Sequence, residues 1–199
     1  MAMAQPTLIV VGGLAGCGKT TLAAALARHF PNSVHLDSDR VRKEIFGVSE
    51  TTRLPAEAYT AEAKSLVFDE INRRIEKYFA EGKTIIVSAA VLSPRTKTYR
   101  EQLAADYNAT FAGIFLQADL HVLFDRVARR VDDVSDAGAD VVQFQAASAA
   151  DTGGWPVIDA SQSPEAVFQA ALKIIQDART SGANPRPRRP SGTDPGGSL

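Results

Sequence analysis

The segment Gly13-Leu14-Ala15-Gly16-Cys17-Gly18-Lys19-Thr20 constrains the fold of this chain more than any other part of the sequence. It follows the short apolar run 7–11 and precedes the helix-forming stretch 21–27, so it occupies a strand-to-helix turn. Glycines in such a turn let backbone N–H groups converge on an anion, and the helix N-terminus adds the positive end of its dipole. The pattern Gly-x-x-x-x-Gly-Lys-Thr in this context predicts a phosphate-binding loop.

The loop also predicts how a nucleoside triphosphate, ATP with Mg²⁺, is held. Lys19 is expected to reach the β- and γ-phosphates as a catalytic group, and the Thr20 hydroxyl is expected to ligate Mg²⁺. Cys17 occupies a variable position of the motif, so its side chain is interpreted as structural filler. The residues expected to contact the nucleotide are Gly13, Ala15, Gly16, Cys17, Gly18, Lys19, Thr20 and Thr21.

Short β-branched runs alternate with amphipathic stretches along the chain, which is typical of an α/β fold with a mainly parallel sheet. Strands are predicted at 7–11, 33–37, 84–88, 110–116 and 156–159. Helices are predicted at 19–30, 39–46, 56–81, 95–107, 119–131 and 164–179. We therefore expect a P-loop NTPase with five strands, helices on both faces, a lid segment, and ligands bound beyond the carboxyl ends of the strands.

Composition bounds the remaining possibilities. Of the 199 residues 45% are apolar, so residues 1–180 are expected to form one domain with a buried core. Residues 181–199 are rich in Pro, Arg, Gly and Ser, which predicts a disordered tail. The formal net charge is -1 and no apolar run reaches the length of a bilayer span, so no membrane partner is expected. One cysteine and three dispersed histidines argue against disulfides and a zinc site, and favour a cytoplasmic location.

Two carboxylates, Asp37 and Asp39, lie where the predicted strand 33–37 ends. Because the carboxyl ends of parallel strands meet at one edge of the sheet, both should lie opposite the phosphate loop. A carboxylate that orients an acceptor hydroxyl and accepts its proton assists phosphoryl transfer, and we assign this role to Asp39. Asp37 is expected to hold a Mg²⁺-bound water. Alternatively, Ser38 or Asp39 caps the following helix, which is compatible with catalysis.

On these residues the sequence resembles the small P-loop kinases related to gluconate kinase, shikimate kinase and the zeta toxins. It is most similar to uncharacterised bacterial predicted kinases, some of which are fused to an aminoglycoside-phosphotransferase-like domain. The more particular motifs are Ser38-Asp39-x-x-Arg42-Lys43 and Asp133-x-Ser135-Asp136-Ala137, and the likeness covers roughly residues 7–178. The resemblance implies an alcohol-group phosphotransferase that uses ATP to phosphorylate a small hydroxylated molecule.

The stretch that follows strand 110–116 corresponds to the lid of these kinases, which folds over ATP. Arg126 and Arg130, four residues apart on one helical face, are expected to neutralise charge on the transferred phosphoryl group as catalytic residues. Arg126 is also expected to contact the nucleotide. A basic helix end that complements the helix dipole is the alternative.

The third predicted strand departs from the nearest relatives, because Ser88 stands where they carry an aspartate. One expected outer-shell Mg²⁺ carboxylate is therefore missing, although gluconate kinases also tend to have serine there. Ser88 is a candidate for binding the substrate or a metal-bridging water. Next in the chain, Arg95, Lys97 and Arg100 are expected to begin a helix that faces the crevice, where one of them could bind an anionic acceptor group. Exposed helix charges without a ligand are the alternative. The candidate substrate contacts are Asp39, Arg42, Ser88 and Arg95.

Three classes of function remain open. The preferred class is a small-molecule kinase whose acceptor is a sugar acid, an antibiotic or a nucleoside-like molecule. A polynucleotide 5′-kinase or a zeta-type toxin kinase is the second class, but the lack of a basic groove interleaved with aromatics disfavours a nucleic-acid partner. The third is an ATP-binding sensor or degenerate kinase, which the serine at position 88 supports. The sequence identifies neither the acceptor nor the oligomeric state.

Overall fold

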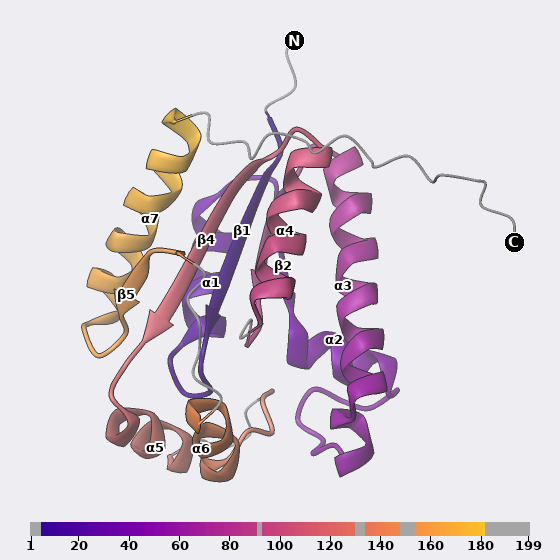
Figure 1. Ribbon diagram of the computed structural model, residues 1–199, viewed down its shortest axis with the longest axis vertical. Coiled ribbons are helices and arrows are strands. Elements are labelled where there is room, and N and C mark those ends of the chain that lie inside the picture. Colours follow the sequence, from indigo (N-terminus) through magenta and orange to yellow (C-terminus); the bar gives the residue numbers. More distant parts are fainter. Residues whose placement is uncertain (1–4, 91–92, 130–133, 148–153, 182–199) are drawn as a thin grey trace, which may run out of the picture.

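The structure is a computed structural model that describes residues 5–90, 93–129, 134–147 and 154–181 (Figure 1). Within these ranges, five parallel strands form one sheet in the order β2-β3-β1-β4-β5. The strands are β1 (Thr7–Gly13), β2 (Ser33–Asp37), β3 (Thr84–Ser88), β4 (Thr110–Gln117) and β5 (Val157–Asp159). All five predicted strands are confirmed, and the sheet is parallel throughout rather than mainly so.

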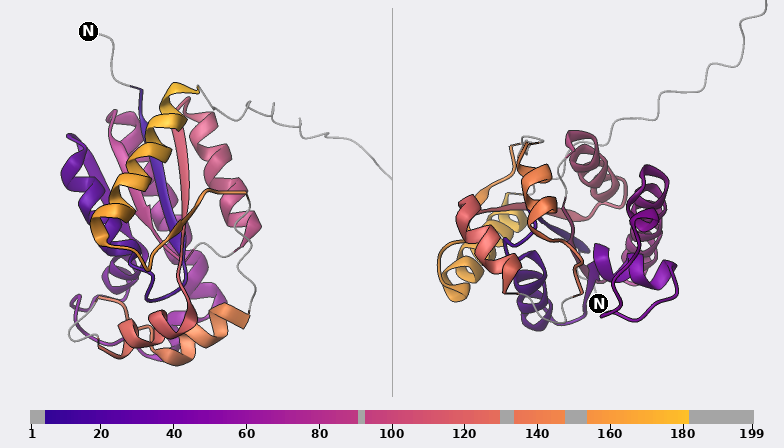
Figure 2. Two further views of the ribbon diagram at one scale, coloured as in Figure 1. Left: turned by 90° about the vertical axis from the view of Figure 1, so that its left-hand side faces the viewer. Right: turned by 90° about the horizontal axis from the view of Figure 1, so that it is seen from below.

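Helices cover both faces of the sheet, as predicted. They are α1 (Lys19–His29), α2 (Ser38–Ile45), α3 (Ala61–Ala80), α4 (Pro94–Asp106), α5 (Leu120–Ala128), α6 (Ala139–Ala147) and α7 (Pro164–Thr180). Helices α1 and α7 pack on one face, and α3 and α4 pack on the other. Figures 1 and 2 show α5 and α6 side by side beyond the carboxyl ends of the strands.

The central strand β1 is buried on both faces, which explains its continuous run of apolar residues. Ile9 and Val11 belong to the core under α1 and α7, whereas Leu8 and Val10 belong to the core under α3 and α4. Because successive side chains of a strand point to opposite faces, one short segment anchors both layers. The loop that follows β1 is therefore attached to a strand that is packed in both cores.

Two predicted helices differ from the structure. The expected helix 56–81 is divided into a 3₁₀ helix, η1 (Ala56–Tyr59), and α3, because the Thr60 side chain accepts a hydrogen bond from the Ala63 amide and caps α3. Helix α6 was not predicted, since the sequence analysis assigned neither a helix nor a strand to residues 139–147. The expected helix 119–131 corresponds to α5, which ends at Ala128, and most of the expected tail, 182–199, lies outside the described residues.

Candidate active site

The phosphate loop joins the end of β1 to the start of α1. Gly13, Gly16 and Gly18 have φ angles of 139°, 84° and 89°, which residues with a Cβ atom rarely adopt. A Cβ on Gly13 would lie 2.4 Å from the Leu116 carbonyl oxygen in β4. Gly18 precedes α1 without a side-chain cap, and no described residue apart from its two chain neighbours lies within 4 Å of where its Cβ would be. The first amides of α1 are therefore available to an anion, which fits a bound phosphate group.

Two contacts define the present arrangement of the loop. The Lys19 ammonium donates a hydrogen bond to the Leu14 carbonyl oxygen, with 2.8 Å between the two atoms, so the side chain lies back across the loop. The Ala15 amide donates to the Gln145 side-chain oxygen of α6 at 2.8 Å. Helix α5 approaches the same loop, because a Cβ on Gly16 would lie 3.0 Å from the Leu123 carbonyl oxygen. The α5–α6 segment thus packs directly on the phosphate loop.

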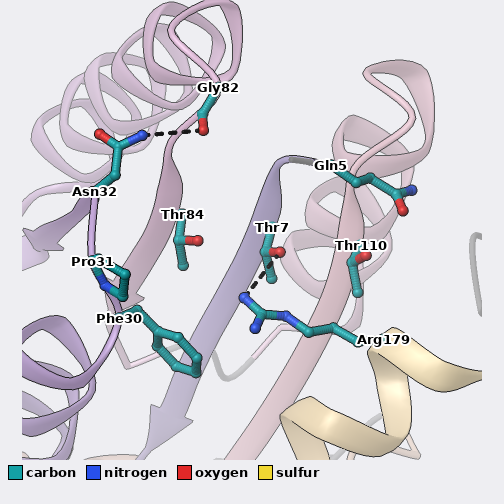
Figure 3. A pocket seen from close by; sticks show the side chains of 9 residues that line it. All are labelled: Gln5, Thr7, Phe30, Pro31, Asn32, Gly82, Thr84, Thr110 and Arg179. Atoms are coloured by element: carbon teal, nitrogen blue, oxygen red, sulfur yellow. Dashed lines mark hydrogen bonds between the residues drawn. The ribbon is translucent and has the colours of Figure 1, made fainter. Parts of the chain in front are cut away.

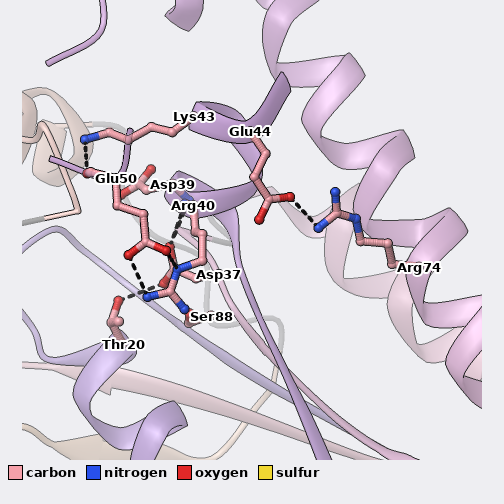
Figure 4. A network of polar contacts seen from close by, with 9 residues as sticks. All are labelled: Thr20, Asp37, Asp39, Arg40, Lys43, Glu44, Glu50, Arg74 and Ser88. Atoms are coloured by element: carbon pink, nitrogen blue, oxygen red, sulfur yellow. Dashed lines mark hydrogen bonds and ion pairs between the residues drawn. The ribbon is translucent and has the colours of Figure 1, made fainter. Parts of the chain in front are cut away.

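Asp37 is the centre of the polar network beside this loop (Figure 4). One carboxylate oxygen accepts hydrogen bonds from the Thr20 hydroxyl at 2.8 Å and the Ser88 hydroxyl at 2.6 Å. The other accepts from the backbone amides of Asp39 at 3.0 Å and Arg40 at 3.1 Å. Asp37 is therefore the N-cap of α2. The alternative that Ser38 or Asp39 caps this helix is wrong, because the cap is the residue before them.

The protonation of this network follows from its contacts. Burial acts to raise the pKa of Asp37, but the hydrogen bonds from Ser88, the Arg40 amide and Thr20 lower it below its ordinary value. The Ser88 hydroxyl, which donates to Asp37, is also 2.8 Å from the His35 Nε2 atom, and burial lowers the pKa of His35. Ser88 is only 1% exposed, so it orients Asp37 from behind rather than presenting its hydroxyl to the crevice.

Asp39 lies in the first turn of α2 and is half-buried. Burial raises its pKa, and the neighbouring Asp37 charge adds to this effect, against a hydrogen bond from Ser135 and the charge of Lys19. A carboxylate with a raised pKa is a stronger proton acceptor than an exposed one. The Asp39 carboxylate is therefore better suited to accept a proton than an exposed aspartate would be.

A buried ion pair joins α2 to the segment before α6. The Lys43 ammonium is 3.1 Å from an Asp136 carboxylate oxygen, and these side chains are 1% and 9% exposed. Asp136 also accepts hydrogen bonds from the Tyr59 hydroxyl at 2.6 Å and the Leu54 amide at 2.9 Å. These bonds and the one from Lys43 lower the pKa of Asp136 against the effect of burial, which acts to raise it. The sequence analysis quoted Asp136 only as part of a motif of the family resemblance and assigned no role to Asp136, Tyr59 or Gln145.

The remaining predicted cations occupy different surroundings. Arg42 is buried, donates to the Ala58 carbonyl oxygen at 2.7 Å and lies over the Tyr59 ring. Arg126 of α5 donates at 2.8 Å to the carbonyl oxygen of Ala160, directly after β5. Arg95 is exposed at the start of α4, and Arg130 lies outside the described residues.

Two cations of α4 do not face the crevice, contrary to expectation. Lys97 is 2% exposed and lies 5.1 Å from the centre of the Phe115 ring and 5.5 Å from that of the Trp155 ring. Arg100 is equally buried, contacts Asn72 and lies over an aromatic ring of α3. Aromatic faces attract cations, so both side chains serve the packing of α4.

Metal binding at this site would need ligands from the nucleotide. Within the described ranges, no group of three or more His, Cys, Asp or Glu side chains could hold a metal ion. Mg²⁺ commonly keeps several waters and binds one or two protein oxygens together with substrate phosphates. A hydroxyl and a carboxylate already joined at 2.8 Å, Thr20 and Asp37, fit that requirement.

A separate cavity of about 560 Å³ lies at the opposite edge of the sheet, near the amino ends of the strands (Figure 3). Thr7, Thr84 and Thr110 occupy one register across three neighbouring strands there. The Arg179 guanidinium is 3.4 Å from the Thr7 hydroxyl and 4.7 Å from the centre of the Phe30 ring. Ligands of parallel α/β sheets bind beyond the carboxyl ends, so this cavity is not the candidate site.

Replacing Asp37 by Ala is expected to lower the free energy of unfolding by about 1–3 kcal/mol, because α2 loses its N-cap and two hydroxyl donors lose their acceptor. Urea unfolding at neutral pH measures this difference. The pKa of Asp37 is lowered in the folded state, so its stabilisation is present above about pH 4 and is lost as the pH falls through the folded-state pKa. Equal unfolding curves for the two proteins at neutral pH would contradict the assignment.

An all-parallel sheet with a phosphate loop after its central strand defines the class of P-loop α/β proteins. The chain belongs to the AAA domain family, whose model matches residues 8–151. Among the described residues, none of the helices is long and apolar enough to cross a bilayer.

The fold is that of the small P-loop kinases, as the sequence analysis expected. A gluconokinase from Sinorhizobium meliloti 1021 is similar with a TM-score of 0.62 and 22% identity, over 89% of this chain and 96% of that one. A shikimate kinase from Bacteroides thetaiotaomicron is similar with a TM-score of 0.57 and 19% identity, over 87% and 98%.

A relative in Mycobacterium tuberculosis, an uncharacterised protein, is 28% identical over 175 residues. That match covers 86% of this chain and 35% of the relative, so the chain spans about a third of the length of the curated relatives it matches.

Proposed function

We propose that this chain is a kinase that transfers the γ-phosphoryl group of ATP to a hydroxyl group of a small molecule. The observation that carries the proposal is the 2.8 Å hydrogen bond between Thr20 and Asp37, with the half-buried Asp39 two residues further on. This bond joins the phosphate loop to Asp37, and Asp39 adds a second carboxylate at the same edge of the sheet. Phosphoryl transfer requires little more than such positioning and charge neutralisation.

The donor half of the proposed site consists of the loop and its neighbours. The uncapped amides at the start of α1 would bind phosphate oxygens, and Lys19 would leave the Leu14 carbonyl to neutralise phosphate charge. Thr20 would ligate Mg²⁺, and Asp37 would hold one of its waters. When bound, Mg²⁺ supplies positive charge beside the transferred group. Arg126, which donates to the Ala160 carbonyl, is proposed to contact the nucleotide, and Arg130 is proposed with it from the family resemblance.

The acceptor half centres on Asp39, which is proposed to accept the proton of the attacking hydroxyl. Of the other proposed substrate residues, Arg42 and Ser88 are buried and bonded to Ala58 and Asp37. Arg42 is therefore proposed to hold the acceptor side of the site in place, and Ser88 is proposed to orient Asp37 beside it. Arg95 is exposed and is the one proposed to contact an anionic acceptor group.

The test is ADP release by the full chain with ATP and Mg²⁺, in the presence of sugar acids, aminoglycoside antibiotics, nucleosides or a 5′-hydroxyl oligonucleotide. We expect ADP release to depend on one small-molecule class and on Mg²⁺, and the phosphorylated acceptor to appear by mass spectrometry. ATP binding without release for any acceptor would favour a sensor. Release with the oligonucleotide alone would favour a polynucleotide kinase.

A further inference from the structure

A side chain of α6 reaches into the phosphate loop. The Gln145 Oε1 atom is 2.8 Å from the Ala15 backbone nitrogen, and the two residues are 130 positions apart in the chain. The placement of α6 is set by packing, because Val142 of α6 is fully buried in one core cluster with Leu123 and Val127 of α5. Val127 in turn would lie 3.2 Å from a Cβ on Gly16. The contact is therefore built into the packing of the α5–α6 segment on the loop.

The donor in this contact, the Ala15 amide, belongs to a loop that is suited to bind an anion. Backbone amides of a phosphate loop are the donors that receive phosphate oxygens, and the Ala15 amide lies within that loop. Gln145 supplies a neutral carbonyl oxygen to this donor. A carboxamide carries an acceptor and two donor hydrogens at the same end, so rotation about its last bond exchanges them. One side chain can thus contact the loop and also contact an oxygen bound to the loop.

We propose that Gln145 is a nucleotide-binding residue that the motif does not contain. Its carboxamide oxygen occupies the place of a phosphate oxygen at the Ala15 amide. When ATP binds, a phosphate oxygen takes this place and the Gln145 amide group turns to donate a hydrogen bond to it. The inference rests on the proposed function, since it assumes that the loop binds a nucleoside triphosphate.

Two substitutions of Gln145 test whether its carboxamide donates a hydrogen bond to bound ATP. Gln145→Leu has a similar volume and removes both acceptor and donors, and it is expected to weaken ATP binding about tenfold, because a hydrogen bond to a charged phosphate exceeds the neutral one it replaces. Gln145→Glu keeps the acceptor but adds a negative charge and has no donor when ionised. It is expected to weaken ATP binding about 100-fold or more, since the carboxylate holds the Ala15 amide and repels phosphates. Isothermal titration calorimetry with ATP and Mg²⁺ gives each dissociation constant.

Gln143 provides the matched control, because it is exposed on the same helix two residues away. Gln143→Leu and Gln143→Glu should bind ATP like the wild type. Thermal unfolding without nucleotide checks folding, and Gln145→Asn, one methylene shorter, tests the same contact if the leucine variant does not fold. Equal or tighter ATP binding by Gln145→Leu, or by Gln145→Asn in its place, overturns the inference alone and would mean that Gln145 only blocks the loop. Failure of the wild type to bind ATP would overturn the proposed function together with the inference.

Discussion

Asp39→Asn is expected to slow acceptor-dependent ADP release by about 10²–10⁴-fold, the usual contribution of a general base. Asparagine keeps the size of the side chain but cannot accept the proton of the attacking hydroxyl. The phosphate loop is unchanged, so the dissociation constant for ATP should stay close to that of the wild type. Initial rates with the acceptor found by screening, together with ATP titration, separate the two effects.

The control for this variant is Asp69→Asn, which makes the same chemical change at an exposed position of α3. It is expected to retain the wild-type rate. An Asp39→Asn protein with an unchanged rate would contradict the base assignment. A protein that has lost ATP binding would instead indicate that Asp39 belongs to the donor half.

The pH dependence of the rate is a second measure of the same residue. Burial raises the pKa of Asp39 above its ordinary value, and a general base must be unprotonated. The rate should therefore be lost as the pH falls through this raised pKa, with a midpoint above the ordinary aspartate value of about 3.9.

Asp136→Ala is expected to have the largest effect on stability, a loss of about 3–5 kcal/mol in the free energy of unfolding, because it leaves a buried charge without its partner. Among the described residues, the Lys43 ammonium, whose side chain is 1% exposed, would keep only its 2.7 Å hydrogen bond to the Glu50 carbonyl oxygen. The Tyr59 hydroxyl and the Leu54 amide would also lose their acceptor. Urea unfolding followed by circular dichroism measures the difference.

Two further variants sharpen this prediction. The double variant Lys43→Met with Asp136→Leu replaces the pair by apolar side chains of similar size and should recover much of the lost stability. Asp125→Ala removes one partner of an exposed pair, whose side chains are 73% and 83% exposed, and should leave stability nearly unchanged. If Asp136→Ala unfolded at the same urea concentration as the wild type, the ion pair with Lys43 would not stabilise the packing of α2 against the segment before α6.

The elements with strong local patterns could be predicted from the sequence. A run of apolar β-branched residues such as 85–87 can be recognised from the local sequence, because a strand buried on both faces has apolar residues at successive positions. Helix α7 was similarly accessible, since Ser163 caps it and Pro164 occupies its first turn. Helix α6 was missed because its nine residues follow a polar stretch and show no clear amphipathic period.

The surroundings of charged side chains could not be predicted in the same way. The positive charge of Lys97 suggested an exposed group, whereas α4 packs it against Phe115 and Trp155. Trp155 lies far along the chain and reaches this position only when β4 and β5 pair. Side chains of this kind are buried by tertiary packing, which leaves no period in the local sequence.

By itself the sequence determined the alternating strands and helices, the phosphate loop and the position of Asp37 and Asp39 at the carboxyl end of β2, because each depends on neighbours within a few residues. The tertiary structure alone decided that the Asp37 carboxylate accepts hydrogen bonds from Thr20 and Ser88, and that Asp136 pairs with Lys43 across 93 positions. It also decided that Gln145 meets Ala15. Such pairs are selected by which surfaces pack together, and no local pattern of residues encodes that choice.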